Sequence, residues 1–425
     1  MKTKLWLLLS FLTVTVTWLY TVRVLRPWEH FVNVEHGNLK GEMGDLYSPW
    51  VGTRELLLHG SNPYEPEVSQ QIQMAFYGHA IHQRYGGLGA KLIDEQRFAY
   101  PVYVVLLLAP TAYADFQKLQ VWAAAILALL TAFSVLLWMD ALRWRPPKAV
   151  TAAIVLFTLS SPQVMQGLRL RQLGLLVGFL VAMGAWCVIR NYLTLAGITL
   201  ALSTIKPQMA LLPLCCFLIW VMGDFARRWR LLASFLLMLL FLVGSGELIL
   251  PGWIGYFLAG VAAYRKYLPT TAPLRVALGD MAGEILGAVI VSALLVFTWR
   301  SRKVSADSRR FTSLFAAFLT ITILAFPLFP PFNQVMLILP VVLFLRDWNT
   351  LPKLWRYVFA FSVGWPWAIA SVLLIFPPRL NSTSQLPLLP SFLVLFFPFF
   401  LSVLLLTGRG VASASQPGAT DLSLP

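Results

Sequence analysis

Three small groups of charged residues stand out in a chain that is otherwise strongly apolar. Glu42 and Asp45 lie in one short polar stretch, and Lys206 interrupts an apolar run just before a proline. Arg169 and Arg171 stand in a very short turn between two other apolar runs. A carboxylate can remove a proton from an attacking hydroxyl. Arginine and lysine can bind a phosphate and stabilise it as a leaving group. These residue types predict a reaction on a phosphate-bearing substrate held at the edge of a membrane.

Each of these groups also has a plain structural alternative. Glu42 and Asp45 could be ordinary solvated loop acids. Arg169 and Arg171 could be interfacial arginines that extend toward lipid headgroups, and Lys206 could do the same at a helix end. Lys206 is the hardest to explain in this way, because a lysine on the outer side of a membrane gains nothing from the positive-inside rule.

The composition indicates a membrane protein. The chain has 425 residues, of which 58% are hydrophobic and 12% charged, and its mean hydropathy is +0.72. One water-soluble core cannot bury so much apolar surface. The net charge of +15 arises mainly from Lys and Arg clusters between apolar runs. Such clusters are typical of cytoplasmic loops, so we expect membrane lipids as neighbours and no nucleic-acid partner.

The apolar runs predict an all-α polytopic protein with about twelve transmembrane helices. The run 100–113 is short and contains two prolines, which favours a re-entrant or interfacial segment over a full span. The first run lacks a cleavage signal and is interpreted as a retained helix rather than a signal peptide. The predicted spans are 5–22, 119–139, 149–162, 172–189, 193–206, 208–222, 231–250, 284–299, 311–328, 333–345, 357–376 and 391–407.

The distribution of charge decides which way these spans run. If 100–113 does not cross, more than half of the 33 Lys and Arg residues fall in cytoplasmic pieces, as the positive-inside rule requires. Both termini are then cytoplasmic, and a large outer loop occupies 23–118. We expect one integral-membrane domain over 1–410, with an amphipathic interfacial helix starting near Pro66 in that loop. Residues 411–425 have the composition of a disordered tail.

Sites of other kinds are not indicated. Cys187, Cys215 and Cys216 all lie in apolar runs, which excludes a CxxC metal motif and a disulfide framework. No spacing of the histidines resembles a zinc helix, and no glycine-rich nucleotide loop occurs. A carboxylate base needs no metal to function, so we expect neither a metal nor another cofactor.

Four stretches in order resemble the polytopic GT-C glycosyltransferases of family 87. They are "GDLYSPWVGTRELLLHGSNPY", "RFAYPVYVVLLLAP", "RLRQLGLLVGFLVAMGAW" and "LALSTIKPQMALLPL". The resemblance covers roughly residues 40–230, and the order and spacing of the four stretches carry it. That family includes polyprenyl-phosphate-mannose-dependent mannosyltransferases that build bacterial envelope glycolipids.

The resemblance implies a GT-C fold and an inverting transfer of a sugar, such as mannose or another hexose, from a polyprenyl-phosphate donor to a glycolipid or glycan acceptor. It implies that Asp45 is the general base. Glu42, three residues before it, is a candidate substrate-binding residue on sequence grounds alone, and whether it shares the work of Asp45 stays open. Tyr64 corresponds to the end of a G-x-x-P-Y element. Gln172 corresponds to a "GQ"-like position, and Lys206 with Gln208 to a K-P-x element.

The chain departs from the family pattern at two places. Arg171 stands where the family often has the glycine of "GQ", and Asn333 with Gln334 stand where many members have a histidine. The hypothesis from sequence is a multi-pass enzyme of a bacterial inner membrane whose site faces the outer side and binds substrate through Arg169, Arg171 and Lys206. A lipid flippase using the same cations is the alternative, and a non-catalytic assembly protein is a third reading.

Overall fold

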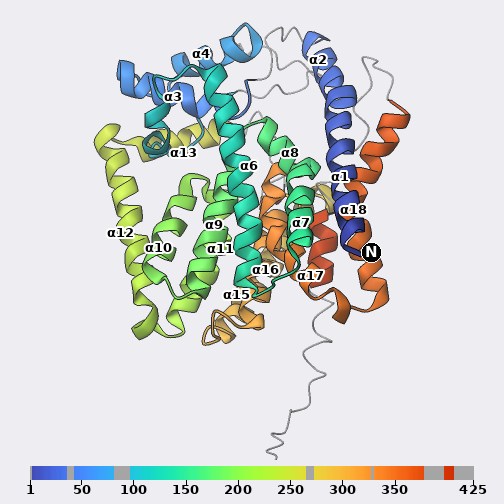
Figure 1. The fold of residues 1–425 in the computed structure, drawn as a ribbon. Helices are drawn as coiled ribbons and strands as arrows, with labels where there is room; N and C mark the ends of the chain where they lie inside the picture. Colours follow the sequence, from blue (N-terminus) through green and yellow to red (C-terminus); the bar gives the residue numbers. More distant parts are fainter. Residues whose placement is uncertain are drawn as a thin grey trace, which may run out of the picture.

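The computed structural model describes residues 2–35, 43–80, 96–264, 272–326, 330–377 and 397–405. These residues form helices joined by turns, and none of them lies in a strand. The all-α fold class is therefore confirmed for the described part of the chain. Figure 1 shows upright helices arranged side by side, with α3, α4 and α13 lying across their upper end.

The upright helices make up most of the molecule. They are α1 (Lys2–Tyr20), α6 (Phe116–Ala141), α7 (Lys148–Ser160), α9 (Gly174–Ile189), α10 (Leu193–Leu202), α11 (Pro207–Met222), α12 (Phe225–Ile249), α15 (Asp280–Arg300), α16 (Arg309–Ala325), α17 (Ile338–Arg346) and α18 (Lys353–Ile375).

Shorter helices connect and cover these. They are α2 (Arg26–Glu35), α3 (Tyr47–His59), α4 (Pro66–Tyr77), α5 (Val104–Leu108), α8 (Pro162–Arg169), α13 (Trp253–Tyr264) and α14 (Pro273–Leu278), the 3₁₀ helices η3 (Ala109–Thr111), η4 (Ser203–Ile205), η5 (Pro331–Leu337) and η6 (Trp348–Thr350), and the π-helical segment η1 (Thr21–Leu25). A further helical segment covers 397–405.

Among the described residues, five helices are long and apolar enough to cross a membrane, and a bent pair raises the number to six. The five are Lys4–Phe31, Phe116–Ala141, Phe225–Ile249, Asp280–Arg300 and Lys353–Ile375. Helices also occupy the described parts of the other predicted spans, but these are shorter, as in the 16 residues of α9. The number of about twelve spans therefore stays a prediction.

Two segments of the predicted outer loop have the expected helical form. The helix α4 begins at Pro66 and buries Ile72. The run 100–113 contains only α5, of five residues, followed by the single turn η3. A helix of this length cannot cross a bilayer. The outer disposition of both segments remains a prediction.

The bend between α7 and α8 positions part of the site. Ser161 ends α7 and also begins α8, where its hydroxyl accepts a hydrogen bond from the backbone N–H of Val164. Pro162 follows as the first residue of α8, and proline cannot continue the hydrogen bonding of a preceding helix. The two helices therefore meet at an angle of 60°, which turns α8 away from the axis of α7.

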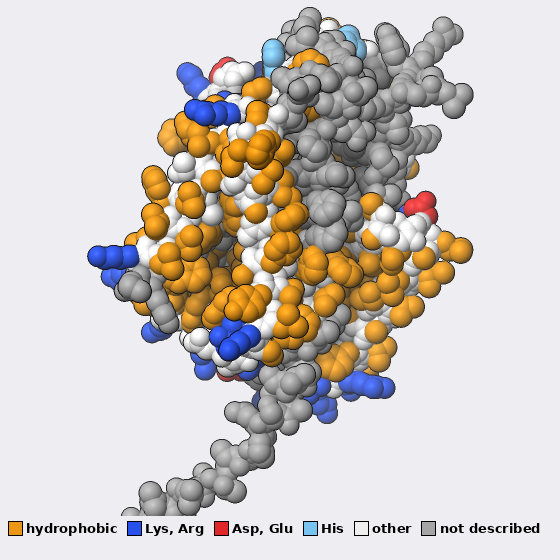
Figure 2. Space-filling view, turned by 90° about the vertical axis from the view of Figure 1, so that its right-hand side faces the viewer, with side chains coloured by type: hydrophobic (Ala, Val, Ile, Leu, Met, Phe, Trp, Pro, Cys, Tyr) orange, Lys and Arg blue, Asp and Glu red, His pale blue; other side chains and the backbone are white. Residues whose placement is uncertain are grey.

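The surface has the pattern of a membrane protein. On the face in Figure 2, hydrophobic side chains cover the middle of the molecule, and Lys and Arg side chains lie at its margins, mostly toward the lower edge and some at the upper left. Large apolar side chains of α12 are exposed, among them Leu237 and Leu240 at 68%. Exposure of this kind is stable in lipid rather than in water.

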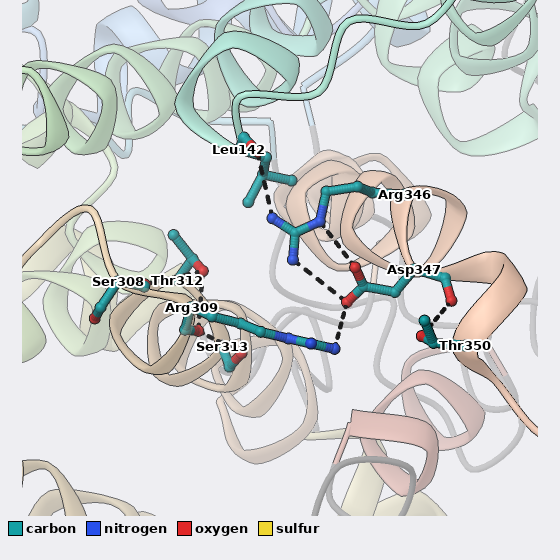
Figure 3. A network of polar contacts seen from close by, with 8 residues as sticks. All are labelled: Leu142, Ser308, Arg309, Thr312, Ser313, Arg346, Asp347 and Thr350. Atoms are coloured by element: carbon teal, nitrogen blue, oxygen red, sulfur yellow. Dashed lines mark hydrogen bonds and ion pairs between the residues drawn. The ribbon is translucent and has the colours of Figure 1, made fainter. Parts of the chain in front are cut away.

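A polar network joins three helices at the lower end of the molecule (Figure 3). The Asp347 carboxylate accepts hydrogen bonds from Arg346, which precedes it, and from Arg309 at the start of α16, at 2.9 Å each. Arg346 also donates to the backbone carbonyl of Leu142, just beyond α6, at 3.3 Å. One carboxylate thus holds together the ends of α6, α16 and α17.

Replacing Asp347 by Asn should lower the free energy of unfolding by about 1–3 kcal/mol, because two arginines lose a charged partner that is largely buried. The matched control is Asp307→Asn, since the pair of Asp307 with Arg143 is well exposed and should contribute less than about 1 kcal/mol. Thermal unfolding in detergent measures both variants. Equal loss of stability in the two proteins would contradict the role assigned to Asp347.

Candidate active site

The turn between α8 and α9 is the centre of the site. The helix α8 ends as Gln172 donates its backbone N–H to the carbonyl of Gly167 at 2.8 Å. This geometry requires a left-handed residue, and Arg171 takes that place with φ at +52°. Glycine is the usual residue in this conformation because it has no Cβ. The chain therefore accepts backbone strain to keep an arginine in the turn.

The segment before α3 lies directly on this turn. The backbone N–H of Asp45 donates to the carbonyl of Leu170 at 2.8 Å. Gly44 makes the approach possible, because its φ is +69° and a Cβ there would lie 2.8 Å from the same carbonyl oxygen and 3.3 Å from Nη1 of Arg171. Asp45 is thereby fixed to a part of the chain that is far away in sequence.

The side chain of Gln172 connects the acid to the lysine. Its Nε2 donates to Oδ2 of Asp45. Its Oε1 accepts from Nζ of Lys206 at 2.8 Å, from the hydroxyl of Tyr100 at 3.2 Å and from the backbone N–H of Gly174 at 3.3 Å. Gln172 itself is only 4% exposed. Four segments of the chain therefore meet at one carboxamide.

The orientation of this carboxamide follows from its partners. An ammonium group is only a donor, so Lys206 must face the oxygen of Gln172. The amide nitrogen then faces Asp45, and it can only donate, which requires an accepting carboxylate oxygen. A carboxylate has about four acceptor positions, so a group of this kind can accept hydrogen bonds from several donors at once.

Lys206 lies at a break between two helices. It follows η4 and precedes Pro207, the first residue of α11, and it is only 8% exposed. Its Nζ lies 4.9 Å from the centre of the Phe332 ring in η5. A Cβ on Gly174 would lie 3.3 Å from Nζ of Lys206 and 3.4 Å from Oδ1 of Asn333. Asn333 therefore also borders the buried lysine.

Arg169 has a different environment from the other cations. It forms an ion pair with Glu29 of α2 through two hydrogen bonds, and both side chains are largely buried. Its backbone carbonyl accepts from Nη1 of Arg171 at 2.6 Å. Arg169 therefore connects α2 to α8 and orients Arg171, whereas the prediction from sequence gave it a role in substrate binding.

Tyr64 does not contact Gln172 through a hydrogen bond but holds the segment that contains Tyr100. Its hydroxyl donates to the backbone carbonyl of Tyr100 at 2.6 Å, and its ring packs edge-on against Phe98. Burial raises the pKa of Tyr64. Burial, and then the charge of Asp45, raise the pKa of Tyr100. Both phenols therefore stay neutral and act as donors, and Tyr64 holds the segment that presents Tyr100 to Gln172.

The predicted residues thus separate into groups. Asp45, Gln172 and Lys206 are in direct contact, with Arg171 in the same turn. Gln208 is exposed at the start of α11, and no hydrogen bond joins its side chain to this cluster. Glu42 lies outside the described residues. Among the described residues, no three His, Cys, Asp or Glu side chains gather in a way that could hold a metal ion.

Two residues of the site were not predicted from sequence. Tyr100 occurs in the stretch "RFAYP" that contributes to the family resemblance, and its place before Pro101 was the available signal. Glu29 had none, because nothing in its local sequence indicates a partner 140 positions away.

Comparison with known proteins agrees with the resemblance. The model of a family described as Glycosyltransferase family 87 matches residues 98–330, which is more than half of the chain. The match begins later and extends further than the resemblance over residues 40–230, so it contains Arg171, Gln172 and Lys206 but not Asp45. No curated protein and no solved structure matches the chain.

Replacing Gly44 by Ala tests how Asp45 is held. We expect a loss of about 2–4 kcal/mol, because left-handed strain adds to a clash with the carbonyl of Leu170. Gly60→Ala is the control, since Gly60 has the same φ of +69° but open space around it, and strain alone should cost about 1–2 kcal/mol. Unfolding in detergent measures the difference, and equal losses would show that the contact with Leu170 is unimportant.

Proposed function

We propose that this chain, which belongs to glycosyltransferase family 87, is a membrane glycosyltransferase that moves a hexose, such as mannose, from a polyprenyl-phosphate sugar to an acceptor hydroxyl. The acceptor in this proposal is an envelope glycolipid or glycan. Family membership supports the glycosyl transfer, and the described helices support a location in a membrane.

One observation carries the proposal. The carboxylate of Asp45 and the ammonium of Lys206 bind the two ends of the same Gln172 carboxamide. Arg171 stands in the adjoining turn. A carboxylate and two cations that lie close together can serve both substrates of a sugar transfer. The carboxylate acts on the acceptor hydroxyl, and the cations act on the phosphate of the donor.

The reaction follows from these roles. Asp45 accepts the proton of the acceptor hydroxyl, and that oxygen forms a bond to the anomeric carbon of the sugar. The bond between this carbon and the phosphate oxygen breaks, and the phosphate leaves with the electron pair. Lys206 and Arg171 stabilise the charge that develops on it. Attack from the face opposite the leaving phosphate inverts the configuration of the sugar.

The same cations make a metal ion unnecessary for charge stabilisation, so we propose that transfer is independent of metals. We also propose that the site faces the outer side of a bacterial inner membrane and that both termini are cytoplasmic. The distribution of basic residues supports this orientation. The turn after α8 lies at one end of α9, and Arg190 lies at the other, roughly 24 Å away at the rise of a helix.

Replacing Asp45 by Asn should lower kcat at least about 100-fold, because the amide cannot accept the proton of the acceptor. Transfer of labelled sugar from a polyprenyl-phosphate donor by the purified protein, with and without EDTA, is the measurement. Rates with and without EDTA should be equal.

The control is Asp280→Asn, which changes an exposed acid at the start of α15 and should leave the rate unchanged. Full transfer by a correctly inserted Asp45→Asn protein would remove the base from the mechanism. A lipid transporter could use the same cations but would have no need of Asp45. Movement of lipid without sugar transfer would therefore favour that alternative.

Arg171→Gly should separate the function of the side chain from the strain of the backbone. We expect unfolding free energy within about 1 kcal/mol of the wild type, since glycine removes left-handed strain, and a kcat at least tenfold lower. Asn191→Gly is the control, because Asn191 also has a positive φ, of +63°, and lies at the other end of α9. A fully active Arg171→Gly protein would show that the phosphate does not need this cation.

A further inference from the structure

A cavity of about 410 Å³ lies between α1, α7, α17 and α18. It is separate from the contacts around Gln172 and is lined almost entirely by apolar and aromatic side chains. These include Trp6, Leu9, Phe157, Val341, Phe359 and Trp367. Its lining residues lie within helices that form or pack against candidate membrane spans, so an occupant would come from the lipid phase.

Two glutamines that line the cavity belong to elements that also carry residues of the candidate active site. Gln163, at the start of α8, and Gln334, in η5, both line it. The same two elements carry residues of the site. At a helical rise of about 1.5 Å per residue, Gln163 lies roughly 9 Å along α8 from Arg169. In η5, Phe332 and Asn333 precede Gln334 and border Lys206.

The cavity has a limited length and an open side. Along α17 it extends from Ile338 to Leu345, which is roughly 10 Å. Leu9 and Leu12 of α1 line it and are also 40% and 54% exposed, so it opens to the surface beside α1. On the side of α18, no atom lies within 4 Å of the position that a Cβ on Gly364 would take. Gly364 therefore leaves the cavity unfilled.

We infer that this cavity binds the part of the donor's isoprenoid chain nearest the phosphate. The inference rests on the proposed function, since it takes the phosphate to lie at Arg171 and Lys206. A chain in the cavity passes Gln163 and Gln334 and reaches the cationic turn within the length of α8. A bilayer phospholipid is the competing occupant, and it would have to place two acyl chains in a cavity of about 410 Å³.

Gly364→Phe should place an aromatic ring in or beside the cavity, starting from a Cβ position that has open space around it. We expect at least a tenfold higher KM for a donor with a long isoprenoid chain, and a much smaller change for a donor with a single isoprene unit. Gly244→Phe in α12 is the control, because Gly244 also has no atom within 4 Å of a Cβ but lies away from the cavity. It should behave like the wild type with both donors.

A second measurement does not depend on catalysis or on the folding of a variant. A polyprenyl phosphate without sugar, carrying a photoreactive group in its second isoprene unit, is irradiated with the wild-type protein and the labelled peptides are identified. Labelling of α1 and α18 around Leu9 and Val363, lost in Gly364→Phe but kept in Gly244→Phe, supports the inference. Labelling only elsewhere, or labelling by a photoreactive phospholipid that polyprenyl phosphate does not displace, overturns it.

The two experiments also separate this inference from the proposed function. If the wild type transfers sugar but Gly364→Phe has the KM of Gly244→Phe and the label lies elsewhere, the cavity is not the chain site. If the cavity is labelled but the wild type transfers no sugar, the proposed function is wrong and the lipid site stands.

Discussion

The Gln172 carboxamide is the contact on which the arrangement of the site depends. It lies among buried groups whose hydrogen-bonding roles are fixed, because the Lys206 ammonium only donates and the Asp45 carboxylate only accepts. A buried polar group without a partner costs several kcal/mol. The amide gives each ion a hydrogen-bonding partner of the required kind. The positions of the acid and the lysine are thus coupled through one side chain.

Helix breaks make this contact possible. A continuous helix in an apolar environment satisfies its own backbone and directs its side chains sideways. Here α8 begins with Ser161 and Pro162 after the bend, and it ends at Arg171 in a left-handed conformation. The helical path through η4 also breaks at Lys206 before Pro207. Each break turns the chain so that a polar side chain enters the interior, and together they direct Arg171, Gln172 and Lys206 to one place.

Hydropathy and charge could predict the helices and the unusual position of Lys206, because these are properties of local sequence. They could also predict that Lys206 and Asp45 lie at the same end of the helices. They could not predict that Glu29 pairs with Arg169, since that contact depends on how α2 packs. Nor could they give the number of spans, because α9 and α11 have 16 residues each and fall below the length of an unambiguous span. Gln208 follows the family pattern but is exposed, which spacing alone does not reveal.

The cations of the site lie inside the range that the family model matches, whereas Asp45 lies outside it. The residues that would bind phosphate belong to the matched range 98–330 and stand at junctions between helices of the bundle. Asp45 precedes that range and is held by the backbone hydrogen bond to Leu170 and the side chain of Gln172. In the proposed transfer, the phosphate would therefore be bound by residues of the helix bundle, whereas the acid belongs to a segment docked onto it. Such a division would let the segment around Asp45 differ with the acceptor while the phosphate-binding residues stay the same.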